Sequence, residues 1–153
     1  MSEWTKRNPK TEIKSESDET LEKYIMNNYK EILRTGITSK ITDTTVTFAD
    51  KFGDHLTNGK KLTTSQLRRF YGEVKRIQMQ GYEKNESDFI LLKPKLAYAV
   101  GRAGNDNKIK VFYEVIAYMI DNVKDENSFK NFIKIFEAIV AYHRKYEKEK
   151  EDK

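Results

Sequence analysis

The sequence predicts an all-α fold, a compact bundle of five to six helices with a disordered N-terminal tail. Two observations carry this prediction. Apolar residues recur at the three- and four-residue spacing of a helix face in successive segments, and no segment alternates apolar and polar residues as a half-buried strand would. The composition agrees, because 35% of the 153 residues are charged and only 2 are Pro and 7 are Gly. A chain of this length can bury the core of one domain.

The chain divides by composition into three parts. Residues 1–17 carry mixed charge and no apolar period, which predicts a flexible tail. Residues 18–148 are expected to form a single helical domain, and residues 149–153 a frayed, charged C-terminus. Within the tail, Trp4 is as readily disordered as packed on a partner.

The first helix of the domain is expected to start at a cap formed by Ser17 or Asp18 and to end near Thr35. Gly36 follows at the position where glycine commonly ends a helix. After a connector, a second helix is expected over about residues 44–56, with its aromatic residues facing inward.

A third helix is expected in the stretch Leu62–Arg76, and it has the most distinctive pattern in the chain. Thr63 can cap it, and Gln66 at the third helical position can complete a capping box. At about 100° per residue its two faces differ sharply. The apolar face holds Leu67, Phe70, Tyr71, Val74 and Ile77, and the basic face holds Arg68, Arg69, Lys75 and Arg76.

Gly72 lies among these four cations. Glycine inside a helix costs about 1 kcal/mol relative to alanine, so its presence calls for a reason. Two explanations remain open from the sequence. Either a phosphate approaches the bare backbone between the cations, or Gly72 lets another helix pack closely or is simply tolerated.

The segment after the third helix contains Pro94, which does not fit inside a continuous helix. We expect two short helical pieces that meet at Lys93-Pro94, with Leu96, Ala97 and Val100 pointing inward. Two strongly apolar helices should follow. The first covers residues 109–123, and the second starts at a cap formed by Asn127 or Ser128 and ends in the charged C-terminus.

The positive charge is concentrated in the middle of the chain. The whole chain carries +5, whereas residues 51–110 alone carry 13 Lys or Arg against 6 Asp or Glu. A local basic field of this kind favours a polyanionic partner such as nucleic acid, although lysine-rich surfaces are also common in proteins without one. There is no Cys, no apolar run long enough to span a membrane and no signal peptide, so we expect a cytoplasmic protein without a membrane partner.

The sequence does not favour an enzyme. Neither His55 nor His143 belongs to a catalytic or metal-binding motif; His143 follows an apolar helix face, and His55 is expected near the surface. Asp50 and Asp54 share a helix face, but such pairs are common on helices. We therefore expect no catalytic residue, no metal site and no cofactor.

Two motifs together resemble a known family. Leu62-Thr63-Thr64-Ser65-Gln66-Leu67-Arg68-Arg69-Phe70 is similar to the L-T-x-S-Q-L-R-R/K-F signature of the small helical subunit of type III-A CRISPR effector (Csm) complexes. Leu91-Leu92-Lys93-Pro94-Lys95-Leu96-Ala97-Tyr98-Ala99-Val100-Gly101-Arg102 resembles the second signature of that family. The order and spacing of the motifs also fit, over roughly residues 48–146.

The resemblance implies a non-catalytic subunit that stacks along guide RNA and target RNA, beside other effector subunits and neighbouring copies of itself, in antiviral defence. Carried over by position, the RNA-binding candidates are Lys60, Lys61, Gln66, Arg68, Arg69, Lys75, Arg76, Lys93 and Arg102. Sequence is read by base pairing in such complexes, so the protein is expected to contact phosphates. Tyr71 and Tyr98 are expected to be mostly buried, which argues against base stacking.

Two other functions remain open. The chain could be a purely structural module whose basic face docks on an acidic protein, with Met79, Phe89 or Trp4 as exposed apolar contacts. It could also be a helical DNA-binding regulator, although no helix-turn-helix spacing is evident.

Overall fold

The structure, a computed structural model, describes residues 9–59, 62–104 and 107–151, which form helices joined by turns and loops, with no strand among them. Among them, six helices have 12 residues or more, and a short helix, α5, joins two of these. The helices are α2 (Pro9–Thr38), α3 (Asp43–Leu56), α4 (Thr64–Gln80), α5 (Glu86–Ile90), α6 (Leu92–Ala103), α7 (Asn107–Asp121) and α8 (Glu126–Glu151). The all-α prediction is confirmed. None of the described helices is long and apolar enough to cross a membrane.

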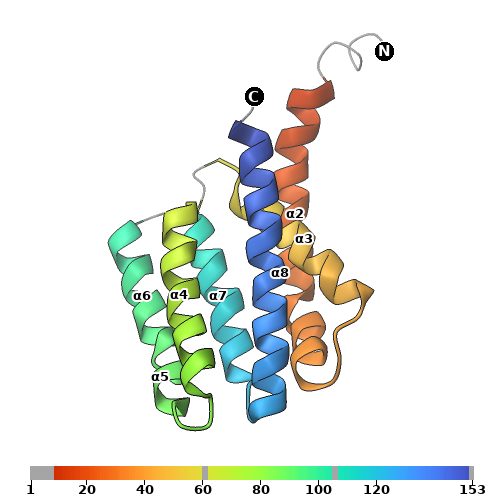
Figure 1. Ribbon diagram of the computed structural model, residues 1–153. Coiled ribbons are helices and arrows are strands. Elements are labelled where there is room, and N and C mark those ends of the chain that lie inside the picture. Colours follow the sequence, from red (N-terminus) through yellow and green to blue (C-terminus); the bar gives the residue numbers. More distant parts are fainter. Residues whose placement is uncertain (1–8, 60–61, 105–106, 152–153) are drawn as a thin grey trace.

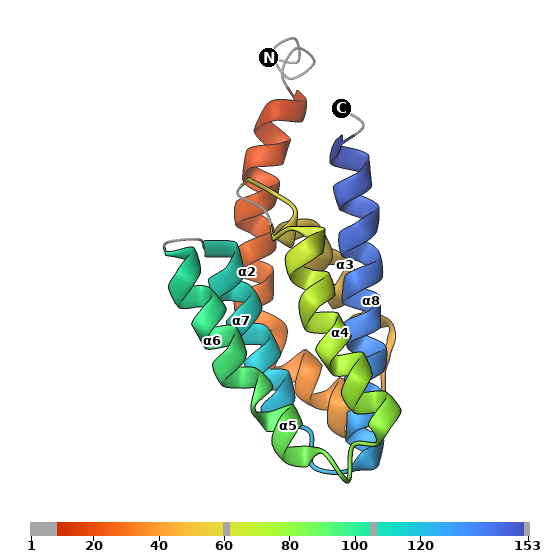
Figure 2. The same ribbon diagram turned by 60° about the vertical axis from the view of Figure 1, so that its left-hand side comes forward.

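The bundle is arranged around α8. Figure 1 shows α2 and α3 on one side of α8 and α4, α7 and α6 on the other. In both views the start of α2 and the end of α8 lie at the same end of the molecule (Figures 1 and 2). Aromatic side chains fill the centre. Phe136 stacks on Phe132 at 6.0 Å and meets Phe70 edge to face at 5.4 Å, which ties α4 to α8.

The first helix is longer than the sequence predicts at both ends. α2 begins at Pro9, where proline is accepted in the first turn, and not at the expected cap Ser17 or Asp18. Residues 1–8 of the expected tail lie outside the described residues. At the other end Gly36 does not end the helix, which continues to Thr38.

Gly36 and Gly53 allow close packing in the part of the bundle that contains α2, α3 and α8. A Cβ at Gly36 would lie 3.0 Å from Ile135 Cδ1. One at Gly53 would lie 2.7 Å from the backbone nitrogen of His143, so α3 and α8 touch through their backbones. The interior role of Gly36 explains why the expectation of a helix end there is wrong.

The start of α4 confirms the predicted capping box. Thr63 Oγ1 accepts a hydrogen bond from the Gln66 amide at 3.1 Å, and Gln66 Oε1 accepts one from the Thr63 amide at 2.8 Å. Gly81 with φ of 100° ends the helix after Gln80. The capping box and Gly81 therefore define the two ends of α4.

The two helical pieces around Pro94 are confirmed, but they meet at Leu91 and not at Lys93. Pro94 lies in the first turn of α6, where no backbone N–H is required. At the start of α8, Asp125 Oδ1 accepts a 2.8 Å hydrogen bond from the Ser128 amide, so the cap is Asp125 and not the expected Asn127 or Ser128. At its other end α8 continues to Glu151.

Candidate nucleic-acid interface

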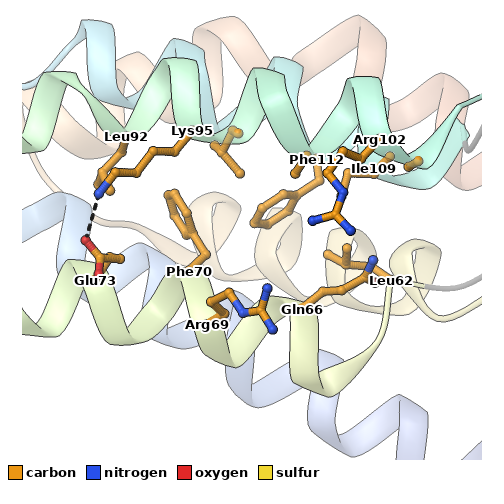
Figure 3. Close-up of a pocket in the computed structure, with 13 residues that line it drawn as sticks. Leu62, Gln66, Arg69, Phe70, Glu73, Leu92, Lys95, Arg102, Ile109 and Phe112 are labelled. Atoms are coloured by element: carbon orange, nitrogen blue, oxygen red, sulfur yellow. Dashed lines mark hydrogen bonds and ion pairs between the residues drawn. The ribbon is translucent and has the colours of Figure 1, made fainter.

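A groove lies between α4 and α6, with α7 beneath it. Its volume is about 520 Å³, and Figure 3 shows the side chains along it. Its floor is apolar and its edges are polar. The floor is formed by Leu62, Phe70, Leu92, Leu96, Ile109 and Phe112, and the edges by Gln66, Arg69, Glu73, Lys95 and Arg102, with Ala99 and Ala103 on the side of α6.

The two ends of the groove differ in charge balance. At one end Lys95 Nζ donates to Glu73 Oε1 across the groove at 3.2 Å (Figure 3). Hydrogen bonds from Lys95 and Arg76 hold the pKa of the Glu73 carboxyl below its ordinary value. At the other end Arg69 from α4 and Arg102 from α6 approach the opening from opposite sides (Figure 3). The first end is neutral and the second is cationic.

Arg69 and Arg102 are exposed, and neither forms an ion pair with any described residue. The guanidinium of Arg102 lies 5.9 Å from the ring centroid of Tyr98, a cation–π contact within α6. Tyr98 is itself 70% exposed, so the expectation that it is mostly buried is wrong. It lies on the outer face of α6 because Leu92 and Leu96 fill the inner one. Ala97 is exposed as well, against the expectation that it points inward.

The outer face of α4 is open. Arg68 is exposed and also lacks an ion pair among the described residues. A Cβ added at the exposed Gly72 would meet no described atom within 4 Å. Packing of another part of this chain against Gly72 is therefore excluded over the described residues. Two explanations stay hypotheses: a phosphate at the bare backbone, and a glycine that is simply tolerated.

Three other predicted residues are each paired with a carboxylate: Lys75 with Glu137 at 3.2 Å, Arg76 with Glu73 at 3.3 Å, and Lys93 with Asp121. The Glu137 carboxylate also accepts a 3.2 Å hydrogen bond from the hydroxyl of the half-buried Tyr71. These pairs are partly exposed, so they hold the cations weakly. Gln66 lies on the groove edge while its oxygen caps α4. Lys60 and Lys61 lie outside the described residues.

The two histidines are both buried. His143 is 1% exposed and its Nε2 lies 2.6 Å from the Leu62 carbonyl oxygen, as expected of a core histidine with a hydrogen-bond partner. The expectation that His55 lies near the surface is wrong, because it is 0% exposed. Asp18 from α2 and Lys108 from α7 cover it: His55 Nδ1 donates to Asp18 Oδ1 at 2.8 Å, and Lys108 Nζ donates to Asp18 Oδ2 at 3.0 Å.

This buried cluster is electrostatically coupled. Burial lowers the pKa of His55, and the ammonium of Lys108 lowers it further, which keeps the imidazole neutral. Burial alone would raise the pKa of Asp18, but hydrogen bonds from Lys108 and Asn58 outweigh it and lower that pKa. The cluster joins α2, α3 and α7, which gives these side chains a structural task.

Asp50 and Asp54, the two acids on one face of α3, each have a hydrogen-bond partner as well. Asp50 Oδ1 accepts a 2.6 Å hydrogen bond from the Tyr146 hydroxyl, and Asp54 Oδ1 one of 2.8 Å from Lys150. Asp50 and its neighbours raise the pKa of Tyr146 above its ordinary value, after the larger contribution of burial. No group of three or more His, Asp or Glu side chains that could hold a metal ion occurs in the part of the chain that the structure describes.

Sequence reasoning found the cations on the edges of the groove but not the groove itself. A signal was present: Lys95, Ala99 and Arg102 share one face of α6, with a small residue between two cations. The angle between α4 and α6, which decides whether that face is packed or open, is not encoded in either helix alone.

Comparison with known families gives one match. The model of the family described as Csm2 Type III-A matches residues 39–149, which run from the residue after α2 almost to the end of α8. No curated protein and no solved structure matches the chain.

Proposed function

This chain belongs to the Csm2 Type III-A family, and from that membership we propose that it binds the backbone of guide or target RNA without catalysing a reaction itself. Family membership makes it a subunit of a type III-A CRISPR effector complex that also contains other subunits. The geometry supports the finer role that we propose. The chain supports the RNA and the assembly by ionic contacts that do not depend on base sequence.

One observation carries the proposal: Arg69 and Arg102 face the same opening from two helices, and no described carboxylate neutralises them. A phosphate between them would accept hydrogen bonds from both guanidinium groups, each of which can donate to two oxygens. Arg68 adds a third cation on the outer face of α4. Phosphates repeat along any RNA, so such contacts hold every sequence alike.

The histidine and aspartate side chains considered as catalytic groups support the non-catalytic part of the proposal. His55 and His143 are buried, and each has a hydrogen-bond partner. Asp50 and Asp54 accept hydrogen bonds from Tyr146 and Lys150. Purified protein that cuts RNA in the presence of Mg²⁺ or Mn²⁺ would contradict this part.

Contacts with other subunits or with neighbouring copies need apolar surface, and some is present. Met79 is 84% exposed, as the sequence suggests, and Ile90 and Leu91 are 57% and 52% exposed. Phe89 is 1% exposed, so its expected role as a surface contact is wrong, and Trp4 lies outside the described residues. We place the protein contacts at the junction of α5 and α6 and the RNA contacts at the arginines.

The test is RNA binding measured over a range of salt concentrations. Replacing both arginines, Arg69→Ala with Arg102→Ala, should weaken binding of any single-stranded RNA by about tenfold for each arginine. The slope of log K against log salt should fall by about 0.7 for each phosphate that the variant no longer neutralises. The control is Lys23→Ala with Arg34→Ala, which removes the same charge from exposed positions of α2. Affinity that barely changes with salt, or equally weakened binding in both double variants, would overturn the proposal.

A further inference from the structure

The groove between α4 and α6 is more than a place for phosphates. A phosphate needs only the cationic edge, where Arg69 and Arg102 lie. The apolar floor runs from there to the Glu73–Lys95 pair, and Phe70 and Phe112 lie along it (Figure 3). Apolar surface at the bottom of a groove offers nothing to a phosphate, so it points to a ligand with an apolar part joined to an anion.

The dimensions and chemistry of the groove restrict which ligands fit it. A volume of about 520 Å³ falls in the usual range of sites for small organic groups. The polar groups are few and lie at the edges, with a cationic end and a neutral end. A nucleotide has matching parts in the same order. Its base is flat, with apolar faces and a polar edge, and its phosphate lies a short distance away.

We infer that the groove takes one unpaired nucleotide of the bound RNA, with its base against the apolar floor and its phosphate between Arg69 and Arg102. The inference rests on the proposed RNA binding and adds base contact to it. The Glu73–Lys95 pair would face the polar edge of the base with one acceptor and one donor. Every base carries both donors and acceptors at its edge, and aromatic and apolar surfaces accept any base, so the contact keeps binding tolerant of sequence.

Abasic RNA separates the two kinds of contact. A short oligouridylate and its abasic counterpart carry the same phosphates, so a protein that contacts only the backbone binds both equally. We expect the full-length chain to bind the oligouridylate about tenfold tighter, the usual gain from one base on an aromatic surface. Fluorescence anisotropy at a fixed salt concentration measures both. Equal affinities would overturn this inference and leave the proposed function standing. No binding of either RNA would overturn both.

Two alanines of α6 provide a matched pair of variants. Ala99 lines the groove, whereas Ala97 on the same helix is exposed and lies outside it. Ala99→Leu should reduce oligouridylate affinity to the abasic level and leave abasic affinity unchanged, while Ala97→Leu should change neither. Ala103→Leu fills the groove at another position and is expected to repeat the result if Ala99→Leu fails to fold.

Two further measurements exclude competing occupants. If the base stacks on the exposed Tyr98 instead, Tyr98→Ala and not Ala99→Leu will abolish the preference for oligouridylate, and the inference fails. Uridine monophosphate presents the same chemistry as a free ligand. We expect it to bind far more weakly than the oligouridylate, because it lacks the neighbouring phosphates. A mononucleotide that binds as tightly would assign the groove to a free nucleotide and overturn the inference.

Discussion

The half of the bundle that contains α2, α3 and α8 is closed, whereas the half in which α4 and α6 flank α7 is open. In the closed half a Cβ on Gly53 would lie 2.7 Å from a backbone atom of α8. In the open half a Cβ on Gly72 would meet no described atom within 4 Å, and a groove of about 520 Å³ lies between two helices. The same residue type in a helix thus indicates backbone contact in one half and free surface in the other.

Cations that bind side chains of the closed half differ in the same way from cations at the groove of the open half. Lys108 is 6% exposed and donates to Asp18 between α2 and α7, so its charge holds helices together. Arg69 and Arg102 are exposed at the groove, with no ion pair among the described residues. All three cations contribute equally to the net charge of residues 51–110. Burial and pairing, and not the number of basic residues, show which of them remain available to a polyanion.

The largest effect is expected from Gly53→Ala. The added methyl group would overlap the backbone of α8 at His143, which no side-chain rotation can relieve, so α3 and α8 must separate. Overpacking of this kind should lower the free energy of unfolding by about 3 kcal/mol. Urea denaturation followed by circular dichroism measures it.

Gly72→Ala is the matched control for that substitution. It places the same methyl group in open space in another helix, and alanine favours helix over glycine by about 1 kcal/mol. The free energy of unfolding should therefore rise. If both variants are less stable than the wild type, the division into a closed and an open half is wrong. Weaker RNA binding by the more stable Gly72→Ala protein would support a phosphate at that backbone.

A smaller decrease in stability is expected from Lys108→Met. Methionine keeps much of the side-chain volume but removes the ammonium that compensates the Asp18 carboxylate. Leaving that carboxylate half-buried without its cation should cost about 2 kcal/mol. Lys110→Met, on the exposed side of α7, is the control and should be neutral. RNA affinity of the folded Lys108→Met protein should match that of the wild type; a tenfold weaker affinity would mean that Lys108 belongs to the interface.

Features set by neighbours in sequence could be predicted. The capping box of Thr63 and Gln66 spans three residues, and the two faces of α4 follow from helical spacing alone. The partnered state of His143 also followed from its place on the apolar face of the last helix. In the first two cases the deciding contact is local, and for His143 the helical period implies burial, although its partner Leu62 lies far away in the sequence.

Features set by packing between distant segments could not be predicted. Gly36 has the residue type of a helix end, but Ile135, far away in the sequence, makes it an interior contact. His55 has polar neighbours in sequence, yet Asp18 and Lys108 from two other helices cover it. Tyr98 has a largely apolar ring, but its position around the axis of α6 leaves it outside. The groove belongs with these, because it exists only through the separation of α4 and α6.

The smallest change in the free energy of unfolding is expected from a change of pH, which acts through the buried side chains around His55. Because burial and Lys108 lower the pKa of His55 below its ordinary 6.5, the unfolded chain takes up this proton more readily than the folded one. Stability should therefore decrease as the pH falls below about 6.5. Asp18, whose pKa is lowered from 3.8, stabilises the fold above that pH and extends the decrease into stronger acid.

The charged groups around His55 determine which variant tests this pH dependence. Asp18 and Glu22 face His55 from α2, and Lys108 faces it from α7. Protonation of His55 adds a positive charge beside the ammonium of Lys108. His55→Gln keeps a polar side chain that does not titrate, and should flatten the fall in unfolding free energy between about pH 7 and pH 5. Urea denaturation at several pH values compares the two proteins. An unchanged slope would mean that His55 is not held neutral in the fold, and the closed half would then tolerate a second buried cation beside Lys108.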